Sequence, residues 1–315
     1  MIMKDKKIAV VGIGATGSVL AAALLQKGPD TILVDPAPGM KNKLLENGIN
    51  ITGEISYPSV PVTHFCSKIS EMENNAPDIV FIATKTFYLP SVIEDLKSIA
   101  KPGIKIISTH NGLGTEDMIA KAFGAGAAFR MSLNFGVALK GPGAVEAAFF
   151  NRPNHLGCLD KTNTEIGKRI AELLTSAGLD TELVDDIKLY VWKKMILKCT
   201  MASICAVTDK SIKDALTSKP AREIAEVCFR EALAVAKAQG YDLGEKYLTD
   251  AFAYLEKVGI HKDSMCGDLE RNNPTEIDFL GGKVVEYARE LGISVPYYTV
   301  MTNLVKELDK AYSAN

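Results

Sequence analysis

The sequence predicts an α/β fold, in which an N-terminal doubly wound parallel sheet is followed by a C-terminal all-helical domain. A short apolar run at Lys7–Val11 leads directly into a glycine-rich turn and an alanine-rich helix, which is typical of a Rossmann-type βαβ unit. Strand-like and helix-like segments alternate through the first half of the chain, whereas the second half is almost entirely helical. Because 315 residues exceed one ordinary core, we expect two domains, residues 1–185 and residues 186–315.

The first domain is expected to combine a parallel sheet with a few antiparallel strands. After the first strand, a helix runs through Gln26, and a second buried strand at residues 31–34 ends beside Asp35. Turns that contain glycine and proline split residues 129–158 into short extended runs, which predicts antiparallel strands there. The other expected elements are strands at residues 78–82, 104–108 and 181–183 and helices at residues 91–100 and 165–177.

The second domain is expected to consist of helices at residues 187–206, 221–239, 245–257, 274–291 and 298–308. For the fourth helix, Asn273 is a suitable N-cap, Pro274 suits the first helical position and Glu276 can close a capping box. Gly281 and Gly282 lie inside this predicted helix, where each glycine costs roughly 1 kcal/mol. They therefore suggest close approach by another backbone or by a ligand.

Composition excludes several classes of function. A net charge of -2 provides no basic field for a nucleic acid. Six cysteines form no C-x-x-C pair and the chain has four histidines, so neither a metal site nor a disulfide framework is expected. The uncharged run at residues 8–25 is interrupted by glycines and is shorter than the roughly 20 apolar residues of a membrane span. We expect a cytoplasmic protein without a signal peptide or a membrane partner.

The glycine-rich turn Gly12-Ile13-Gly14-Ala15-Thr16-Gly17 predicts a dinucleotide-binding site. Glycines at this spacing allow a tight turn, close approach of a pyrophosphate to the backbone and close packing of the helix on the strand. Asp35 lies 23 residues after Gly12, where an acid can accept hydrogen bonds from ribose hydroxyls. Such a carboxylate favours NAD over NADP unless Lys41 or Lys43 compensates, and the alternative interpretation of Asp35 is a simple turn residue.

Two lysines mark the first helix of the second domain. Lys194 and Lys198 are four residues apart and therefore share one face of the helix. Lysines on a solvated surface are the ordinary interpretation of this spacing. Trp192, Met195 and Ile196 make the helix apolar on most sides, however, which places at least one lysine near a buried surface or a cleft.

Six features in register resemble the ketopantoate reductase (2-dehydropantoate 2-reductase) family over nearly the whole chain. They are Gly12-x-Gly14-Ala15-x-Gly17, Lys85 after Phe81-Ile-Ala-Thr84, His110-Asn-Gly-Leu-Gly114, Trp192-x-Lys194, Ser264-Met265 and Thr275-Glu-Ile-Asp278. The resemblance implies an oxidoreductase that uses NADP or NAD to reduce a 2-oxo acid to the (R)-2-hydroxy acid, with the substrate between the two domains. Its leading substrate is 2-dehydropantoate (ketopantoate), which gives pantoate in pantothenate biosynthesis.

The same resemblance implies roles for individual residues. Lys194 would donate a proton to the carbonyl oxygen of the substrate, and Glu276 would hold Lys194 and contact that oxygen. Ser264 would bind the substrate carboxylate, whereas Asn111 and Lys85 would order the nicotinamide end and the substrate. The expected cofactor-binding residues are Gly12, Ile13, Gly14, Ala15, Thr16, Gly17, Asp35, Lys85, Asn111 and Glu276.

The chain departs from the family pattern at two places. Lys198 and Ala202 stand where the family usually has asparagines that contact pantoate, so Lys198 is a candidate to pair with the substrate carboxylate. Asp35 stands where NADPH-selective members tend to carry a basic residue. Both departures favour an alternative enzyme, an NAD-dependent D-2-hydroxyacid dehydrogenase that acts on a bulky or branched acid.

A third function class stays open, a catalytically silent Rossmann protein that senses the ratio of reduced to oxidised NAD(P). The pairing of Lys194 with Glu276 argues against it. The expected partner is a small 2-oxo acid, and the sequence leaves a homodimer and the physiological direction of the reaction open.

Overall fold

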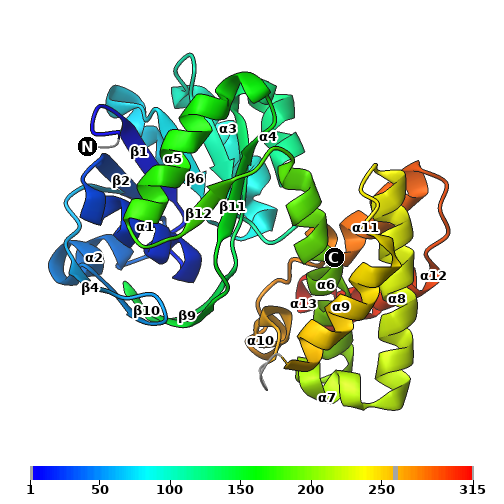
Figure 1. Ribbon diagram of the computed structural model, residues 1–315. Coiled ribbons are helices and arrows are strands. Elements are labelled where there is room, and N and C mark those ends of the chain that lie inside the picture. Colours follow the sequence, from blue (N-terminus) through cyan, green and yellow to red (C-terminus); the bar gives the residue numbers. More distant parts are fainter. Residues whose placement is uncertain (1–2, 258–261, 314–315) are drawn as a thin grey trace. The chain divides into compact units, whose positions relative to one another are not determined.

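The computed structural model describes residues 3–257 and 262–313 of the chain. These residues form two compact units (Figure 1). The α/β unit contains Met1–His110 and Thr115–Ile187, and the helical unit contains Asn111–Gly114 and Lys188–Asn315. A short loop of the first half of the chain thus packs with the helices of the second half. The predicted domain boundary at residue 185 stays a prediction.

An eight-stranded sheet is the centre of the α/β unit. Its strands are β1 (Lys7–Val11), β2 (Asp30–Val34), β5 (Phe65–Cys66), β6 (Ile79–Ile82), β7 (Lys105–Ser108), β8 (Ala128–Ser132), β11 (Asn154–Cys158) and β12 (Thr181–Leu183). They lie in the order β12-β11-β8-β7-β6-β1-β2-β5, and all described neighbours are parallel except β8 and β11. The predicted α/β fold class is confirmed.

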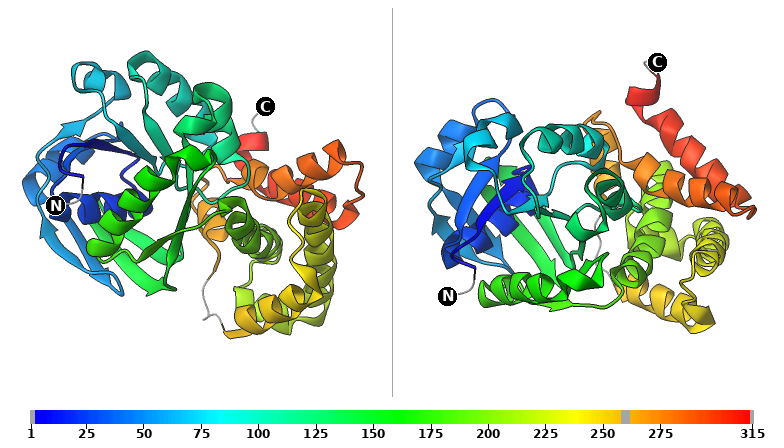
Figure 2. Two further views of the ribbon diagram at one scale, coloured as in Figure 1. Left: turned by 45° about the horizontal axis from the view of Figure 1, so that its top comes forward. Right: turned by 90° about the horizontal axis from the view of Figure 1, so that it is seen from above.

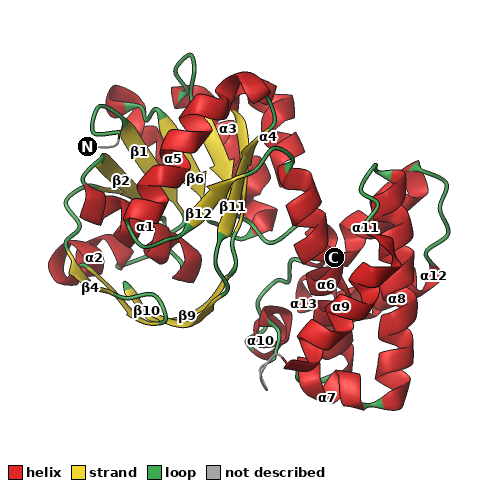
Figure 3. Ribbon diagram, in the orientation of Figure 1, coloured by secondary structure: helices red, strands yellow, loops and turns green. Residues whose placement is uncertain are grey.

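Helices cover both faces of this sheet (Figure 3). Along β1, Ile8 and Val10 belong to one apolar core, whereas Ala9 and Val11 belong to a second core. This alternation follows from the two-residue period of a strand, which sends successive side chains to opposite faces. The helices of the unit are α1 (Ala15–Lys27), α2 (Met40–Asn47), α3 (Leu89–Ile99), α4 (Thr115–Phe123) and α5 (Thr164–Ser176), and the 3-10 turns are η1 (Ile69–Asn75), η2 (Thr86–Tyr88), η3 (Ala125–Ala127) and η4 (Lys161–Asn163).

A second, four-stranded sheet contains β3 (Ile49–Gly53), β4 (Tyr57–Val60), β9 (Phe135–Gly141) and β10 (Ala144–Phe150), in the order β4-β3-β10-β9. The predicted antiparallel strands of residues 129–158 are found as the β9–β10 pair and the β8–β11 pair. The sequence analysis did not find β3 and β4. Buried residues are separated by exposed ones in both strands, and β4 contains a proline, so they lack the continuous apolar run that identified the central strands.

The helical unit consists of α6 (Ile187–Thr208), α7 (Ile212–Thr217), α8 (Lys219–Ala238), α9 (Gly244–Lys257), α10 (Ser264–Glu270), η5 (Ile277–Phe279), α11 (Gly281–Glu290), α12 (Pro296–Leu308) and α13 (Lys310–Ser313) (Figure 2). The longest, α6, buries Trp192, Met195 and Ile196 completely or nearly so. Among the described residues, no helix combines the length and the apolar character that crossing a membrane requires.

The predicted helix at residues 274–291 is wrong in its first part. Residues 273–276 have no regular secondary structure, and α11 begins only at Gly281. The backbone N–H of Asn273, which Glu276 would bond in a capping box, donates instead to the carbonyl oxygen of Asp268 at 2.9 Å. The next N–H, that of Thr275, donates to the carboxylate of Asp309, 34 positions away, at 2.7 Å.

Gly281 is required by close packing, as its position in the sequence suggested. A Cβ atom at Gly281 would lie 2.7 Å from Oγ1 of Thr302 on α12. At Gly281 the close neighbour is thus a side chain, whereas a Cβ atom at Gly282 would lie 3.1 Å from the backbone carbonyl oxygen of Ile277, so the predicted close approach of backbone is found at the second glycine.

Candidate active site

The glycines of the turn between β1 and α1 differ in their surroundings. Two of them are tightly packed, and one faces open space. Gly12 has φ +90°, and a Cβ atom on it would lie 2.7 Å from the backbone nitrogen of Thr84. A Cβ atom on Gly17 would lie 1.8 Å from the carbonyl oxygen of Gly12. A Cβ atom on Gly14 would meet no described atom within 4 Å. Packing of the turn explains Gly12 and Gly17, whereas the backbone at Gly14 faces open space.

The N-terminus of α1 fits an anion. Gly14 is its N-cap, no described side chain caps this end, and the first turn contains no acidic residue. The backbone N–H groups of this turn and the positive end of the helix dipole therefore offer a site for phosphate groups.

Asp35 anchors the glycine-rich turn. One carboxylate oxygen accepts a hydrogen bond from the N–H of Ile13 at 2.7 Å, and the other accepts from the N–H of Ala37 at 2.9 Å. The bond from the Ala37 N–H is the one that an aspartate makes with the backbone two residues further on in a turn, as one interpretation of the sequence expected. The first bond places the carboxylate beside the predicted dinucleotide site. The predicted contact of Asp35 with a ribose stays a prediction.

A buried polar network lies behind the turn. Thr84, which contacts Gly12, has its hydroxyl 3.3 Å from Nε2 of His110, and Nδ1 of His110 is 2.9 Å from Oγ of Ser108. Burial and the nearby charge of Arg130 lower the pKa of His110 to about 3, so its ring is neutral at ordinary pH. Half-buried Lys85 directly follows Thr84, and its predicted contact with the cofactor stays a prediction.

Arg130 is the centre of this network. Its Nη1 donates to Oγ of Ser108 at 2.8 Å and to Oγ1 of Thr115 at 3.0 Å. Its Nε lies 3.6 Å from the carboxylate of Glu116, and both side chains are at most 3% exposed. Because His110 and Thr115 flank the loop of residues 111–114, the network fixes both ends of that loop.

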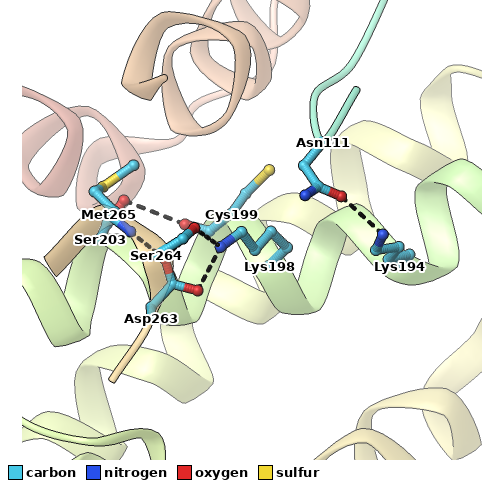
Figure 4. Close-up of polar contacts among 8 residues, drawn as sticks. All are labelled: Asn111, Lys194, Lys198, Cys199, Ser203, Asp263, Ser264 and Met265. Carbon is cyan, nitrogen blue, oxygen red and sulfur yellow. Dashed lines mark hydrogen bonds and ion pairs between the residues drawn. The ribbon is translucent and has the colours of Figure 1, made fainter. Parts of the chain in front are cut away.

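The loop brings Asn111 to Lys194 (Figure 4). Nζ of Lys194 on α6 donates to Oδ1 of Asn111 at 2.8 Å. The N–H of Leu113 donates to the carbonyl oxygen of Phe279 at 2.9 Å, which holds the loop against η5. Lys194 is half-buried, whereas its neighbour Lys193 is exposed. Two predicted site residues that lie 83 positions apart in the sequence are thus in direct contact.

A second polar cluster lies one turn further along α6 (Figure 4). Nζ of Lys198 donates to Oδ2 of Asp263 at 2.5 Å and to Oγ of Ser264 at 2.9 Å. Oδ1 of Asp263 accepts from the N–H of Met265 at 2.9 Å and so caps α10. The sequence analysis named Lys198 and Ser264 but missed Asp263. The signal that could have identified Asp263 is its position immediately before the short helix α10, where an aspartate commonly serves as the N-cap.

Glu276 is half-buried at the start of η5. Its predicted contacts with Lys194 and with a cofactor stay predictions. Its neighbour Thr275 donates both its N–H and its hydroxyl to Asp309, each at 2.7 Å. No pattern in the sequence near Asp309 predicted its contact with Thr275.

These groups can bind an anionic dinucleotide and donate a proton. The glycine-rich turn and the N-terminus of α1 offer N–H donors, and Lys194 offers an ammonium that a neutral amide holds in place. No cluster of three or more His, Cys, Asp or Glu side chains suited to a metal ion occurs in the described part of the chain.

Comparisons with known proteins agree over nearly the whole chain. Two family models, described as "Ketopantoate reductase PanE/ApbA" and "Ketopantoate reductase PanE/ApbA C terminal", match residues 8–161 and 186–309. A 2-dehydropantoate 2-reductase of Streptococcus pyogenes serotype M3 is 29% identical over 299 residues, which cover 94% of this chain and 95% of that protein.

Solved structures give the same result. The structure of 2-dehydropantoate 2-reductase from Geobacter metallireducens GS-15 has a TM-score of 0.86 and 25% identity, and the match covers 96% of this chain and 99% of that one. The ternary structure of D-mandelate dehydrogenase with NADH and anilino(oxo)acetate has a TM-score of 0.85 and 25% identity, and covers 98% of this chain and 99% of that one.

We predict that buried His110 makes the protein less stable in mild acid. Its pKa is about 3 in the folded protein and near 6.5 when unfolded, so the unfolded state binds the proton between these values. The free energy of unfolding therefore falls as the pH drops from 6.5, by about 2 kcal/mol from this residue at pH 5. Urea unfolding of the wild type and of His110→Asn at pH 7 and pH 5 measures this effect.

The asparagine variant is the control because it retains a polar group near the position of Nδ1 but does not titrate. Between pH 7 and pH 5 it should lose about 2 kcal/mol less than the wild type. Equal losses in both proteins would contradict a neutral, buried His110.

Proposed function

The chain belongs to the ketopantoate reductase PanE/ApbA family of oxidoreductases, and from this premise we propose that it reduces a 2-oxo acid to the (R)-2-hydroxy acid with a nicotinamide cofactor. The leading substrate is 2-dehydropantoate, which is named in the relatives of Streptococcus pyogenes and Geobacter metallireducens. One observation carries the proposal: a half-buried ammonium, Lys194, is held at 2.8 Å by the amide oxygen of Asn111. Because the acceptor is a neutral amide, this contact orients the side-chain nitrogen of Lys194 without placing a negative charge beside it.

The α/β unit supplies the residues that fit the cofactor. The open space at Gly14 and the uncapped N-terminus of α1 suit a pyrophosphate, with Ala15, Thr16 and Gly17 in the first turn of the helix. The bond from the Ile13 N–H to Asp35 supports the proposal that Asp35 accepts hydrogen bonds from a ribose. Lys85, Asn111 and Glu276 are proposed to contact the nicotinamide end. A homodimer stays a prediction.

In the proposed reaction, Lys194 is the proton donor. When bound, the reduced nicotinamide supplies the hydride that the carbonyl carbon accepts. As this happens, the carbonyl oxygen gains negative charge, and the Lys194 ammonium both stabilises that charge and donates the proton that completes the hydroxyl group. Asn111 keeps the ammonium oriented, and Glu276 is proposed to hold Lys194 and contact the reacting oxygen.

Lys198 and Ser264 are proposed to bind the substrate carboxylate. Lys198 has three N–H donors, two of which are directed to Asp263 and Ser264. Ser264 accepts a bond from Lys198, and its own hydroxyl donates to Oδ1 of Asp263 over 3.5 Å, a long hydrogen bond that a substrate carboxylate is proposed to replace. Two donors from adjacent groups match the two oxygens of a carboxylate.

A second candidate function is an NAD-dependent D-2-hydroxyacid dehydrogenase. The similar D-mandelate dehydrogenase was solved with NADH, and Asp35 supports the same cofactor in this chain. Lys198 and Ala202, which replace the asparagines that the family usually carries, favour a substrate without the pantoate hydroxyl group.

We predict that Lys194→Ala lowers turnover with 2-oxo acids by about 10²–10⁴-fold, the range typical of losing a general acid. The dissociation constant of the dinucleotide should stay nearly unchanged, because the phosphates are expected at the glycine-rich turn. Steady-state kinetics and fluorescence titration with NADH measure the two effects.

Lys193→Ala is the matched control. Lys193 is exposed and its side chain is rotated by about 100° from that of Lys194. It should keep wild-type turnover. An inactive Lys193 variant together with an active Lys194 variant would show that the proton donor has been assigned to the wrong residue.

We predict that NADH is at least as good a hydride donor as NADPH. A carboxylate beside the ribose accepts from its hydroxyls and repels a 2′-phosphate, and the Ile13 N–H holds Asp35 in place to do so. The ratio of kcat/KM for the two cofactors measures this preference, which Asp35→Asn should reduce.

The asparagine side chain has one acceptor oxygen, so the variant must be checked by thermal unfolding for damage to the turn. A wild-type preference for NADPH of about tenfold or more, or about 1.4 kcal/mol, would show that nearby lysines override Asp35.

We predict weak discrimination between 2-dehydropantoate and 2-oxoisovalerate, which lacks the hydroxymethyl group. A site that hydrogen-bonds a substrate hydroxyl can reject the analogue without it by about 10⁴–10⁵-fold, whereas an apolar pocket separates such pairs by about 10². Ala202 provides no such bond, so we expect a difference below about 10² in kcat/KM. Oxidation of NADH and NADPH with these acids and a panel of branched 2-oxo acids measures it.

The same assay distinguishes the 2-dehydropantoate reductase from the D-2-hydroxyacid dehydrogenase and from the catalytically silent sensor. A preference for 2-dehydropantoate of about 10³-fold or more would exclude the D-2-hydroxyacid dehydrogenase and show that other groups bond the hydroxyl. No oxidation of either cofactor with any acid would favour the catalytically silent sensor.

A further inference from the structure

The end of α12 is tied to the segment that carries Glu276. Oδ2 of Asp309 accepts from the N–H and from the hydroxyl of Thr275, each at 2.7 Å. Asp309 is 2% exposed and Thr275 is 7% exposed, so these are buried bonds to a carboxylate. Such charge-assisted bonds are roughly twice as strong as neutral ones, and a buried carboxylate without them is strongly unfavourable.

The bonds to Thr275 fix a short turn. Glu276 follows Thr275 directly, and its carbonyl oxygen accepts from the N–H of Phe279 at 3.0 Å, which closes η5. A 3-10 turn of three residues has little stability of its own. The position of η5 therefore depends on the residues that hold its two ends. Thr275, which directly precedes Glu276, is one of these residues.

The same turn holds the loop of Asn111. The carbonyl oxygen of Phe279 accepts from the N–H of Leu113 at 2.9 Å. Leu113 lies two residues after Asn111, whose Oδ1 accepts from Lys194 at 2.8 Å. A series of buried and half-buried contacts thus runs from Asp309 through η5 to Lys194, all of it inside the helical unit.

Two further polar contacts between these segments are on the surface. Lys306 forms an ion pair with Asp278 at 2.7 Å, with side chains 32% and 53% exposed, and the hydroxyl of Tyr312 also contacts Asp278. Exposed ion pairs contribute little because water screens them. Ile277 of η5 is fully buried, so apolar packing also holds the turn, and Asp309 adds the buried polar contact at the residue before Glu276.

We infer that Asp309 is a positioning residue for the proposed reaction: through Thr275 and η5 it places both Glu276 and the Asn111 loop relative to Lys194. This inference rests on the proposed function. Asp309 does not touch the reacting atoms, and it acts by fixing two segments that do. A shift of about 1 Å in such groups can lower a rate by about 10²-fold.

The test compares four variants of the full chain. Asp309→Ala removes the acceptor and should lower kcat with 2-oxo acids by about 10–100-fold, with little change in KM. Asp309→Asn retains an acceptor oxygen and should restore kcat to within about threefold of the wild type. Thr275→Val loses only the hydroxyl bond and should give an intermediate kcat. Lys306→Ala, the surface control, should behave as the wild type.

A purely structural role predicts a different pattern. In that case Asp309→Ala would lower the melting temperature but leave kcat per folded molecule unchanged, and the asparagine variant would give no specific rescue. Unchanged kcat in folded Asp309→Ala, or in Thr275→Val if the alanine variant does not fold, would overturn the inference.

Hydrogen exchange followed by mass spectrometry provides a readout that does not depend on activity. In Asp309→Ala, exchange should accelerate in peptides that contain residues 111–114 and 275–280, and Lys306→Ala should leave both unchanged. If the wild type reduces no 2-oxo acid, the proposed function fails, and exchange still shows whether Asp309 fixes these segments. Unchanged exchange in both peptides would overturn the inference even in an active enzyme.

Discussion

The helical unit depends on one constraint, that α6 is buried along most of its surface and yet carries two lysines on one face. Trp192, Met195 and Ile196 are at most 4% exposed. A partly buried ammonium without acceptors is costly, so Lys194 and Lys198 must each meet oxygen atoms from other segments. Asn111 supplies the acceptor for one, and Asp263 with Ser264 supplies acceptors for the other. Polar contacts as well as apolar packing therefore fix the rotation of α6.

Three aspartate carboxylates hold segments that have no regular secondary structure. Asp35, Asp263 and Asp309 each accept a backbone N–H from a residue that no strand ladder or helix would otherwise satisfy. A backbone donor that is buried must be bonded, and a carboxylate can accept from several donors at once. In this way the glycine-rich turn, the start of α10 and the approach to η5 are ordered without regular secondary structure. All three lie next to proposed site residues.

Local patterns allowed much of this structure to be predicted. The strand, glycine turn and helix at the N-terminus are visible because β1 is apolar and the turn has fixed glycine spacing. The apolar helix indicated that Lys194 or Lys198 lies near a buried surface, and the family resemblance singled out Lys194. Strands β3 and β4 were missed because exposed residues separate their buried ones, so neither has a continuous apolar run. The break before α11 and the partner of Lys198 were missed for another reason. Asp309 and Asp263 lie 34 and 65 residues from the groups they bind, a distance over which one sequence shows no pairing.

The pairing of Lys198 with Asp263 also limits which substitutions the site tolerates. An asparagine, which the family usually has at this position, is neutral and needs no counter-charge, whereas a lysine that is 18% exposed does. Asp263 meets that need while it also caps α10, so neither residue can change without affecting the other. The pair has no net charge. In the proposed function, attraction of a substrate carboxylate would therefore come from the direction of the donors on Lys198 and Ser264 and not from a general positive field, and the position of α10 would then be part of substrate recognition.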